Sequence, residues 1–133
     1  MATTWSPDEL ERIDRAAELL IATRRAEGTL RRWVPIWVVC DQEQVYVRTW
    51  YRRETGWFGD AVRSRRGRIR VPGLEVDVTV VDLGSRGEAR AGVDIAYRTK
   101  YGPGASADRM VTNEAAATTL QLIHERREKA PER

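Results

Sequence analysis

Residues 24–39 read RRAEGTLRRWVPIWVV, and this stretch decides the fold. Two arginine pairs bracket a turn at Glu27-Gly28, and an almost unbroken apolar run follows. Short apolar segments bounded by turn residues predict β-strands, here over 19–25 and 34–39. The second run is apolar on both faces, so we expect both faces to be buried, one of them against another subunit. A third strand is expected over 45–50, and three such strands pair naturally as consecutive hairpins.

The sequence on either side adds helices and further strands. Ser6, Pro7 and Glu9 form a capping-box pattern that predicts a helix over 6–16. The other expected elements are a short helix over 55–62, a strand over 68–71, an alternating strand over 74–83, a helix over 88–101 that ends at Gly102-Pro103-Gly104, a helical turn near 113–116 and a strand over 118–124. Six short strands, mostly antiparallel, predict an α+β, mainly β fold, namely a small barrel with peripheral helices.

Length and composition bound the class of protein. At 133 residues and 41% hydrophobic, the chain suits one domain, expected over 1–124, with a polar, disordered tail over 125–133. No apolar run approaches the about 20 residues of a membrane helix, and the N-terminus lacks a secretory signal. The one cysteine, Cys40, excludes an internal disulfide, and the one histidine, His124, leaves no usual zinc or haem site. We therefore expect a cytoplasmic protein without a metal.

The charge distribution points to an anionic partner. Residues 24–73 hold twelve arginines against five acids, whereas the segments before and after are net acidic. A guanidinium binds phosphate through two parallel hydrogen bonds, so the basic turn after residue 23 is a candidate phosphate site. The alternative is a solvated turn whose arginines pair with Glu27 and neighbouring acids.

Several stretches together resemble a known superfamily. ATRRAEGTLRRWVPIWVV, YVRT, GWF followed by DAV, and RIRV resemble the split β-barrel flavin-binding proteins, with their pyridoxamine-phosphate-oxidase-like and deazaflavin-dependent nitroreductase branches. More closely, with DELERIDRA, AYRTKYG and ATTLQL, the chain resembles the bacterial domain-of-unknown-function family 2255. The resemblance covers nearly the whole chain up to His124. It implies a split β-barrel, usually a homodimer, with FMN or a deazaflavin of the F420 type at the subunit boundary.

The resemblance also implies cofactor-binding residues. In deazaflavin-binding relatives the first hairpin carries basic groups that meet the phosphate and acidic tail. The matching positions here are Arg24, Arg25, Gly28 and Arg31. Thr49 and Trp57 would lie near the flavin ring.

Two departures from the relatives bear on cofactor binding. Ala26 stands where a serine hydroxyl would help to hold the phosphate. The chain has Trp50-Tyr51-Arg52-Arg53 where the relatives have a small Ser/Gly-Gly segment that lets the ring approach the backbone. These side chains could fill the ring site, so the fold could be kept while flavin binding is lost.

A cofactor-free barrel is therefore the alternative function. Its aromatic-lined pocket, with Trp33, Tyr46 and Trp50, would bind a small metabolite or transform it by acid–base chemistry. Arg48, Tyr97 and Lys100 are the candidate catalytic groups, because an amine beside a phenol can lower the phenol pKa. In the structural alternative, Tyr97 packs on the barrel, Lys100 is exposed, and Arg48 is either a buried anion ligand or an outward charge.

Nucleic-acid binding is the third and least favoured function. The run RSRRGRIR over 63–70 is dense in arginine and has aromatic residues nearby in the sequence. However, no nucleic-acid motif is present, and a charged edge strand that resists aggregation explains the run better. Cys40 is interpreted as an inert apolar residue and His124 as structural.

Overall fold

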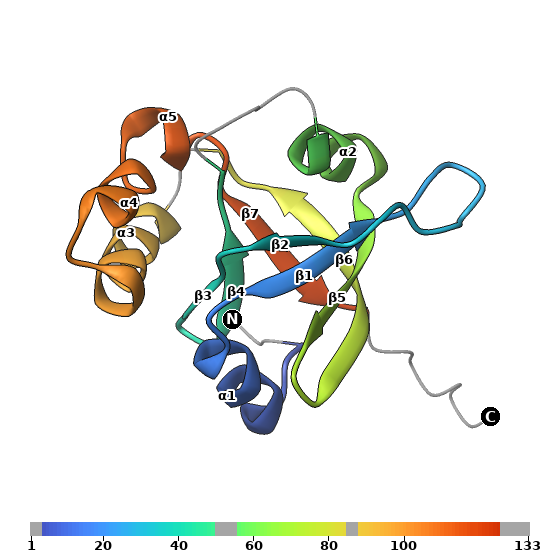
Figure 1. The fold of residues 1–133 in the computed structure, drawn as a ribbon, viewed down its shortest axis with the longest axis horizontal. Helices are drawn as coiled ribbons and strands as arrows, with labels where there is room; N and C mark the ends of the chain where they lie inside the picture. Colours follow the sequence, from blue (N-terminus) through green and yellow to red (C-terminus); the bar gives the residue numbers. More distant parts are fainter. Residues whose placement is uncertain (1–3, 50–55, 85–87, 126–133) are drawn as a thin grey trace.

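The computed structural model describes residues 4–49, 56–84 and 88–125 (Figure 1). These residues form α1 (Pro7–Arg15), β1 (Leu19–Thr23), β2 (Val34–Ile36), β3 (Val39–Asp41), β4 (Gln44–Val47), α2 (Gly56–Ser64), β5 (Arg66–Val71), β6 (Leu74–Asp82), α3 (Ala89–Tyr101), α4 (Ala105–Arg109), α5 (Asn113–Ala116) and β7 (Leu120–His124). Among these described helices, none has the length and apolar character that a membrane crossing requires.

The strands form one antiparallel sheet that curls into a split β-barrel. Their order is β2-β1-β5-β6-β7-β4-β3. β2 pairs with β1 at one edge and β3 pairs with β4 at the other, yet only Trp37 and Val38 separate β2 from β3. Because one stretch of chain follows both edges, the sheet has to curl until the edges meet. The predicted fold class is therefore confirmed.

The barrel interior is aliphatic, as the alternation of the strands predicts. Ile21, Ile69 and Val78 are fully buried, and they come from three neighbouring strands. α1 and α2 lie at opposite ends of the strands in Figure 1 and close the barrel there. α1 begins with the predicted capping box, in which the Ser6 hydroxyl and the Glu9 carboxylate each accept a backbone N–H.

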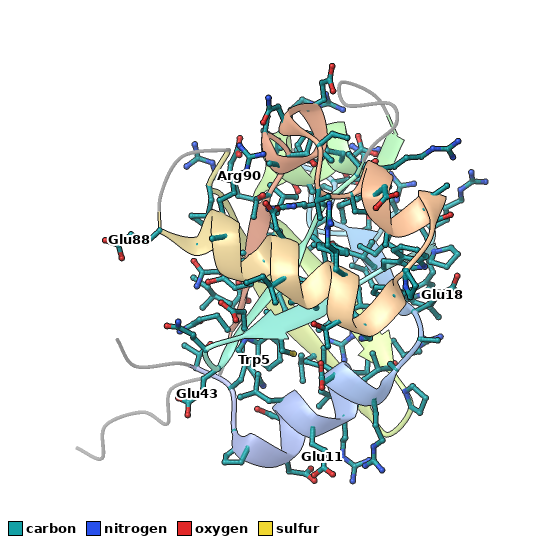
Figure 2. The ribbon with its side chains drawn as sticks, turned by 90° about the vertical axis from the view of Figure 1, so that its left-hand side faces the viewer. Trp5, Glu11, Glu18, Glu43, Glu88 and Arg90 are labelled. Carbon is teal, nitrogen blue, oxygen red and sulfur yellow. The ribbon has the colours of Figure 1, made fainter. Side chains whose placement is uncertain are left out.

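A second apolar cluster lies outside the barrel, between β3, β4 and α3. Val93 and Tyr97 of α3 pack there against Val39, Tyr46 and Met110. In Figure 2, α3 crosses in front of the barrel from Glu88 at its N-terminal side, and Glu18 lies beyond its other end. This second layer holds the polar groups described below.

Most of the expected elements are present, with three differences. The apolar run over 34–39 is divided between β2 and β3, and within it Pro35 is exposed, so burial on both faces does not hold for the whole run. β5 lies between β1 and β6, so the expectation of a charged edge strand is wrong. α4 was not expected, because the sequence after Gly104 shows no apolar periodicity. The tail over 126–133 lies outside the described residues.

Candidate functional site

A pocket of about 320 Å³ lies where β2 and the end of β4 meet α2 and α4. We call it the Arg48 pocket. Its lining residues are Glu18, Pro35, Ile36, Trp37, Arg48, Thr49, Trp57, Ser106 and Met110. Three predicted site residues, Arg48, Thr49 and Trp57, are thus brought together. Two indoles in the lining of one small pocket can pack against a flat ligand, whereas the Arg48 side chain itself is 0% exposed.

Arg48 lies at the centre of a buried hydrogen-bond network. Its side chain is 0% exposed. Nε donates to Thr119 Oγ1 at 2.8 Å, and Nη1 donates to Asp94 Oδ1 at 2.6 Å and to the Met110 carbonyl at 2.7 Å. Nη2 is buried and has no hydrogen-bond partner within the described chain. Arg48 is therefore a buried cation with a buried donor to spare.

Tyr97 and Tyr46 lie on the same side of β4 as Arg48, beneath α3. The Arg48 guanidinium stands 5.6 Å from the centre of the Tyr97 ring. The Tyr97 hydroxyl is fully buried and makes no well-formed hydrogen bond among the described residues; burial raises its pKa strongly, and the nearby charge and backbone of Arg48 offset only part of the rise. Burial, with the charge of Asp41, also raises the pKa of Tyr46. Both phenols stay protonated at neutral pH and cannot act there as bases.

Lys100 lies apart from this cluster and contacts different groups. Its Nζ donates to the Val38 carbonyl at 2.9 Å and to the Ile13 carbonyl at 3.4 Å. The side chain is half-buried, and burial lowers the pKa of its amine. The neighbouring Tyr101 accepts from the Val38 N–H at 3.1 Å and stacks on Trp37, with ring centres 3.9 Å apart. Lys100 therefore joins elements of the fold, and the aromatic ring beside its ammonium is that of Tyr101, whose centre lies 5.3 Å away.

The arginines at the start of the β1–β2 hairpin already bond to groups of the hairpin and of β6. Arg24 donates to the Gly28 carbonyl and to Asp77 on β6, both at 2.7 Å. Arg25 donates to the Leu30 carbonyl at 2.8 Å. Gly28 has φ +102°, a conformation that L side chains rarely adopt, which explains a glycine in this turn. The hairpin tip projects away from α3, α4 and α5 (Figure 1).

Arg31 is the basic hairpin residue with a link to the Arg48 pocket. Its Nε lies 3.6 Å from Asp60 of α2. Asp60 follows Trp57 by three residues on that helix, so both lie on one side of it. Trp33, predicted to line a pocket, instead packs under Arg70, whose guanidinium lies 4.4 Å from the indole centre. Trp50 lies outside the described residues.

Charged groups from three strands pair on the outer face of the barrel. Asp77 accepts from Arg24 and Arg68, and Glu75 accepts from Arg68 and Arg70. Burial alone would raise the pKa of Asp77, but the two arginine hydrogen bonds outweigh it and hold the pKa below its ordinary value. Hydrogen bonds from Arg68 and Arg70 also lower the pKa of Glu75. The dense basic run of β5 is thus largely neutralised within the protein.

Sequence reasoning missed several groups around Arg48. The lining residues that the sequence did not single out are Glu18, Trp37, Ser106 and Met110. Asp94 was missed too. The sequence does contain a signal for it, because Asp94 is the only acidic residue between residues 89 and 101 and precedes Tyr97 by three residues. A cation on an apolar strand needs a counter-charge, and this helix offers only one. Within the described ranges, no cluster of histidine, cysteine and carboxylate groups could hold a metal ion.

Comparisons with known proteins give a family and a fold. The model of a family described as "uncharacterized protein conserved in bacteria (DUF2255)" matches residues 9–122. The chain therefore belongs to that family. No curated protein sequence matches the chain.

Solved structures share the fold at low sequence identity. A candidate 5-nitroimidazole antibiotic resistance protein from Bacteroides thetaiotaomicron superposes with a TM-score of 0.64 at 15% identity, over 91% of this chain and 81% of that one. A conserved hypothetical protein from Mycobacterium tuberculosis gives 0.58 at 14% identity, over 93% and 83%. A structure named F420 reductase gives 0.48 at 14% identity, over 86% and 90%. The first two likenesses show a common fold.

Proposed function

We propose that this member of the DUF2255 family binds a flavin or deazaflavin, with the ring system in the Arg48 pocket, and acts as an oxidoreductase on a small organic substrate. The observation that carries the proposal is the pocket itself, with Trp37 and Trp57 in its lining. The resemblance of the sequence to flavin-binding split barrels supports the same function.

The residues of the pocket fit the ring of such a cofactor. At about 320 Å³, the pocket stands at the lower end of the roughly 300–1,000 Å³ typical of ligand sites, so it holds one ring system and little else. Indoles offer flat apolar surface, and the lining residues Thr49 and Ser106 carry polar groups. Arg31, which pairs with Asp60 on the helix that carries Trp57, would hold the phosphate.

The roles of the residues follow from this placement. A bound flavin supplies hydride transfer. Trp37 orients the ring and has little freedom to move, because it is stacked on Tyr101. Thr49 is buried at the end of the strand that would run along the ring, and its backbone is fixed by two hydrogen bonds with the Thr118 hydroxyl. The buried walls exclude water from the ring edge, which strengthens polar contacts there.

Tryptophan fluorescence tests the proposal, because two of the five tryptophans line the pocket. The purified protein is titrated with FMN, with riboflavin and with a deazaflavin of the F420 type. We expect saturable quenching, which Trp57→Ala weakens for all three ligands. Arg31→Ala should weaken FMN about tenfold and leave riboflavin unchanged, since riboflavin lacks the phosphate.

The matched control is Arg15→Ala, an exposed arginine on α1 that lines no part of the pocket. It should leave all three affinities unchanged. Absence of saturable binding for every flavin and deazaflavin would overturn the proposal.

A cofactor-free pocket for a small metabolite is the second candidate. It is favoured by the hairpin arginines, because Arg24 and Arg25 already donate to groups of the protein. Under this alternative, the protein binds no flavin, and the Arg48 pocket takes an uncharged or anionic aromatic compound directly.

We also propose a homodimer, as the resemblance implies. Light scattering coupled to size exclusion should give twice the mass of one chain, and a single-chain mass at micromolar concentration would contradict this.

A further inference from the structure

A groove of about 700 Å³ lies on the outer face of the barrel, where β1, β5 and β6 are neighbours in the sheet. We call it the outer groove, and its lining residues are Glu18, Leu20, Arg70, Val71, Pro72, Gly73, Leu74 and Glu75. Leu20 and Leu74 are only partly buried, and Pro72 is exposed. The groove therefore offers accessible apolar surface to a ligand.

The outer groove adjoins the Arg48 pocket. Glu18 is exposed and lines both cavities. Leu20, which lines the groove, is the direct register partner of Pro35, which lines the pocket. A ligand in the groove that contacts Glu18 therefore lies beside the proposed flavin site.

Glu18 carries the negative charge of the outer groove that the described protein leaves unpaired. Arg70 and Glu75 pair with each other at 2.9 Å. Arg12 of α1 reaches the rim of the groove at the β5–β6 turn and pairs with Asp8 at 2.9 Å. Glu18 forms no ion pair and no side-chain hydrogen bond within the described ranges. The groove therefore has an apolar middle and an accessible, unneutralised carboxylate at one end.

We propose that the outer groove binds a small organic cation, whose apolar body packs on Leu20 and Leu74 and whose positive group pairs with Glu18. Under the proposed function this cation is the substrate, and only that assignment rests on the proposed function. A carboxylate at the end of an apolar groove selects this class of ligand, because it attracts a cation and repels an anion of the same shape. The volume of the groove has room for a body of one or two rings.

Isothermal titration calorimetry of the purified protein without flavin tests the choice of ligand. It compares 2-naphthylmethylamine, which is a cation at pH 7, with 2-naphthylmethanol, a neutral molecule of the same shape. We expect the amine to bind about threefold to fivefold more tightly, as an exposed ion pair allows. Glu18→Gln should remove this preference and leave the affinity for the alcohol unchanged. The matched control is Glu11→Gln, at an exposed acid of α1 that lines neither cavity, and it should keep the preference.

Leu20→Thr tests the place of the ligand. Threonine suits a strand and removes apolar surface from the groove, so the variant should weaken both ligands about threefold and keep the preference for the amine. If this variant fails to fold, Leu74→Thr makes the same test from β6. Saturating amine should leave the affinity for FMN unchanged, because the two ligands occupy different cavities.

The outcomes separate this inference from the proposed function. Equal affinities for amine and alcohol, a preference that survives Glu18→Gln, or full affinity in the Leu20→Thr variant would each overturn the inference. Displacement of FMN by the amine would also overturn it, since the amine would then lie in the Arg48 pocket. If flavins bind and the amine shows no dependence on Glu18, the proposed function stands and the inference fails. If the amine shows the expected dependence on Glu18 and Leu20 while no flavin binds, the cation site stands and the flavin proposal fails.

Discussion

Two tyrosines that lie one turn apart on α3, Tyr97 and Tyr101, differ in the hydrogen bonding of their hydroxyls. The Tyr97 hydroxyl is buried and has at most a weak interaction with the Arg48 backbone, whereas the Tyr101 hydroxyl bonds to the Val38 backbone and to the Ala17 carbonyl. Removing a buried hydroxyl that is so poorly bonded costs little, so Tyr97→Phe should change the free energy of unfolding by less than about 1 kcal/mol. Tyr101→Phe should lower it by about 1–2 kcal/mol. Urea denaturation of both variants checks the contrast, and an equal loss for Tyr97→Phe would mean that its hydroxyl is well bonded.

The carboxylates of the outer face give a pH dependence whose sign follows from their pKa values. Asp77 and Glu75 have lower pKa values folded than unfolded, because arginines donate to their ionised forms. Their contribution to stability is therefore complete above the unfolded values of about 4 and is lost as the pH falls through the folded values. Urea midpoints between pH 7 and pH 3 should fall more steeply in the wild type than in the Asp77→Asn, Glu75→Gln double variant. If the urea midpoints of the two proteins change equally with pH, the pKa values of these carboxylates are the same in the folded and unfolded states.

At the scale of elements, the sequence predicted what depends on neighbouring residues. The capping box at Ser6 and Glu9 and the alternation of β6 are local patterns, and both are present. The order of strands in a sheet depends on contacts between distant parts of the chain. The position of β5 between β1 and β6 could therefore not be predicted from its basic residues. The partners of Arg48 come from α3, from the residue after α4 and from the residue before β7, which only the fold brings together. Residue types were therefore predictable at this site, but their pairing was not.

The contact between β1 and β5 depends on one glycine. A Cβ on Gly67 would stand 2.9 Å from the Ala22 carbonyl oxygen and 3.5 Å from the Thr23 Cα, and both belong to backbone that cannot rotate away. Gly67→Ala should therefore force the strands apart and lower the free energy of unfolding by about 1–3 kcal/mol. Arg66→Ala, an exposed neighbour on the same strand, should change it by less than about 0.5 kcal/mol. Equal losses in urea denaturation would contradict this account of the contact.

The barrel as a whole is closed at one short connection, Trp37 and Val38, where the chain leaves one edge of the sheet for the other. Among the described strands no ladder joins these two edges, and the Val38 carbonyl accepts its hydrogen bonds from side chains. Lys100 and Tyr101 supply them, and Lys100 also bonds to Ile13 in the last turn of α1. One lysine thus joins α1, α3 and the closure of the barrel.

Lys100→Met tests whether this lysine closes the barrel. It removes the ammonium and keeps an unbranched apolar side chain, so the Val38 carbonyl loses a charged donor while the packing is largely retained. We expect a loss of about 1.5–3 kcal/mol in the free energy of unfolding. Amide hydrogen exchange should accelerate in β2 and β3 and remain unchanged in β5 and β6, because only the two edge strands lose their connection. Uniform acceleration would instead indicate that Lys100 stabilises the whole domain through α1. If the Lys100→Met variant keeps full stability but no longer turns over substrate, Lys100 has the catalytic role that the sequence predicts from its position beside a tyrosine.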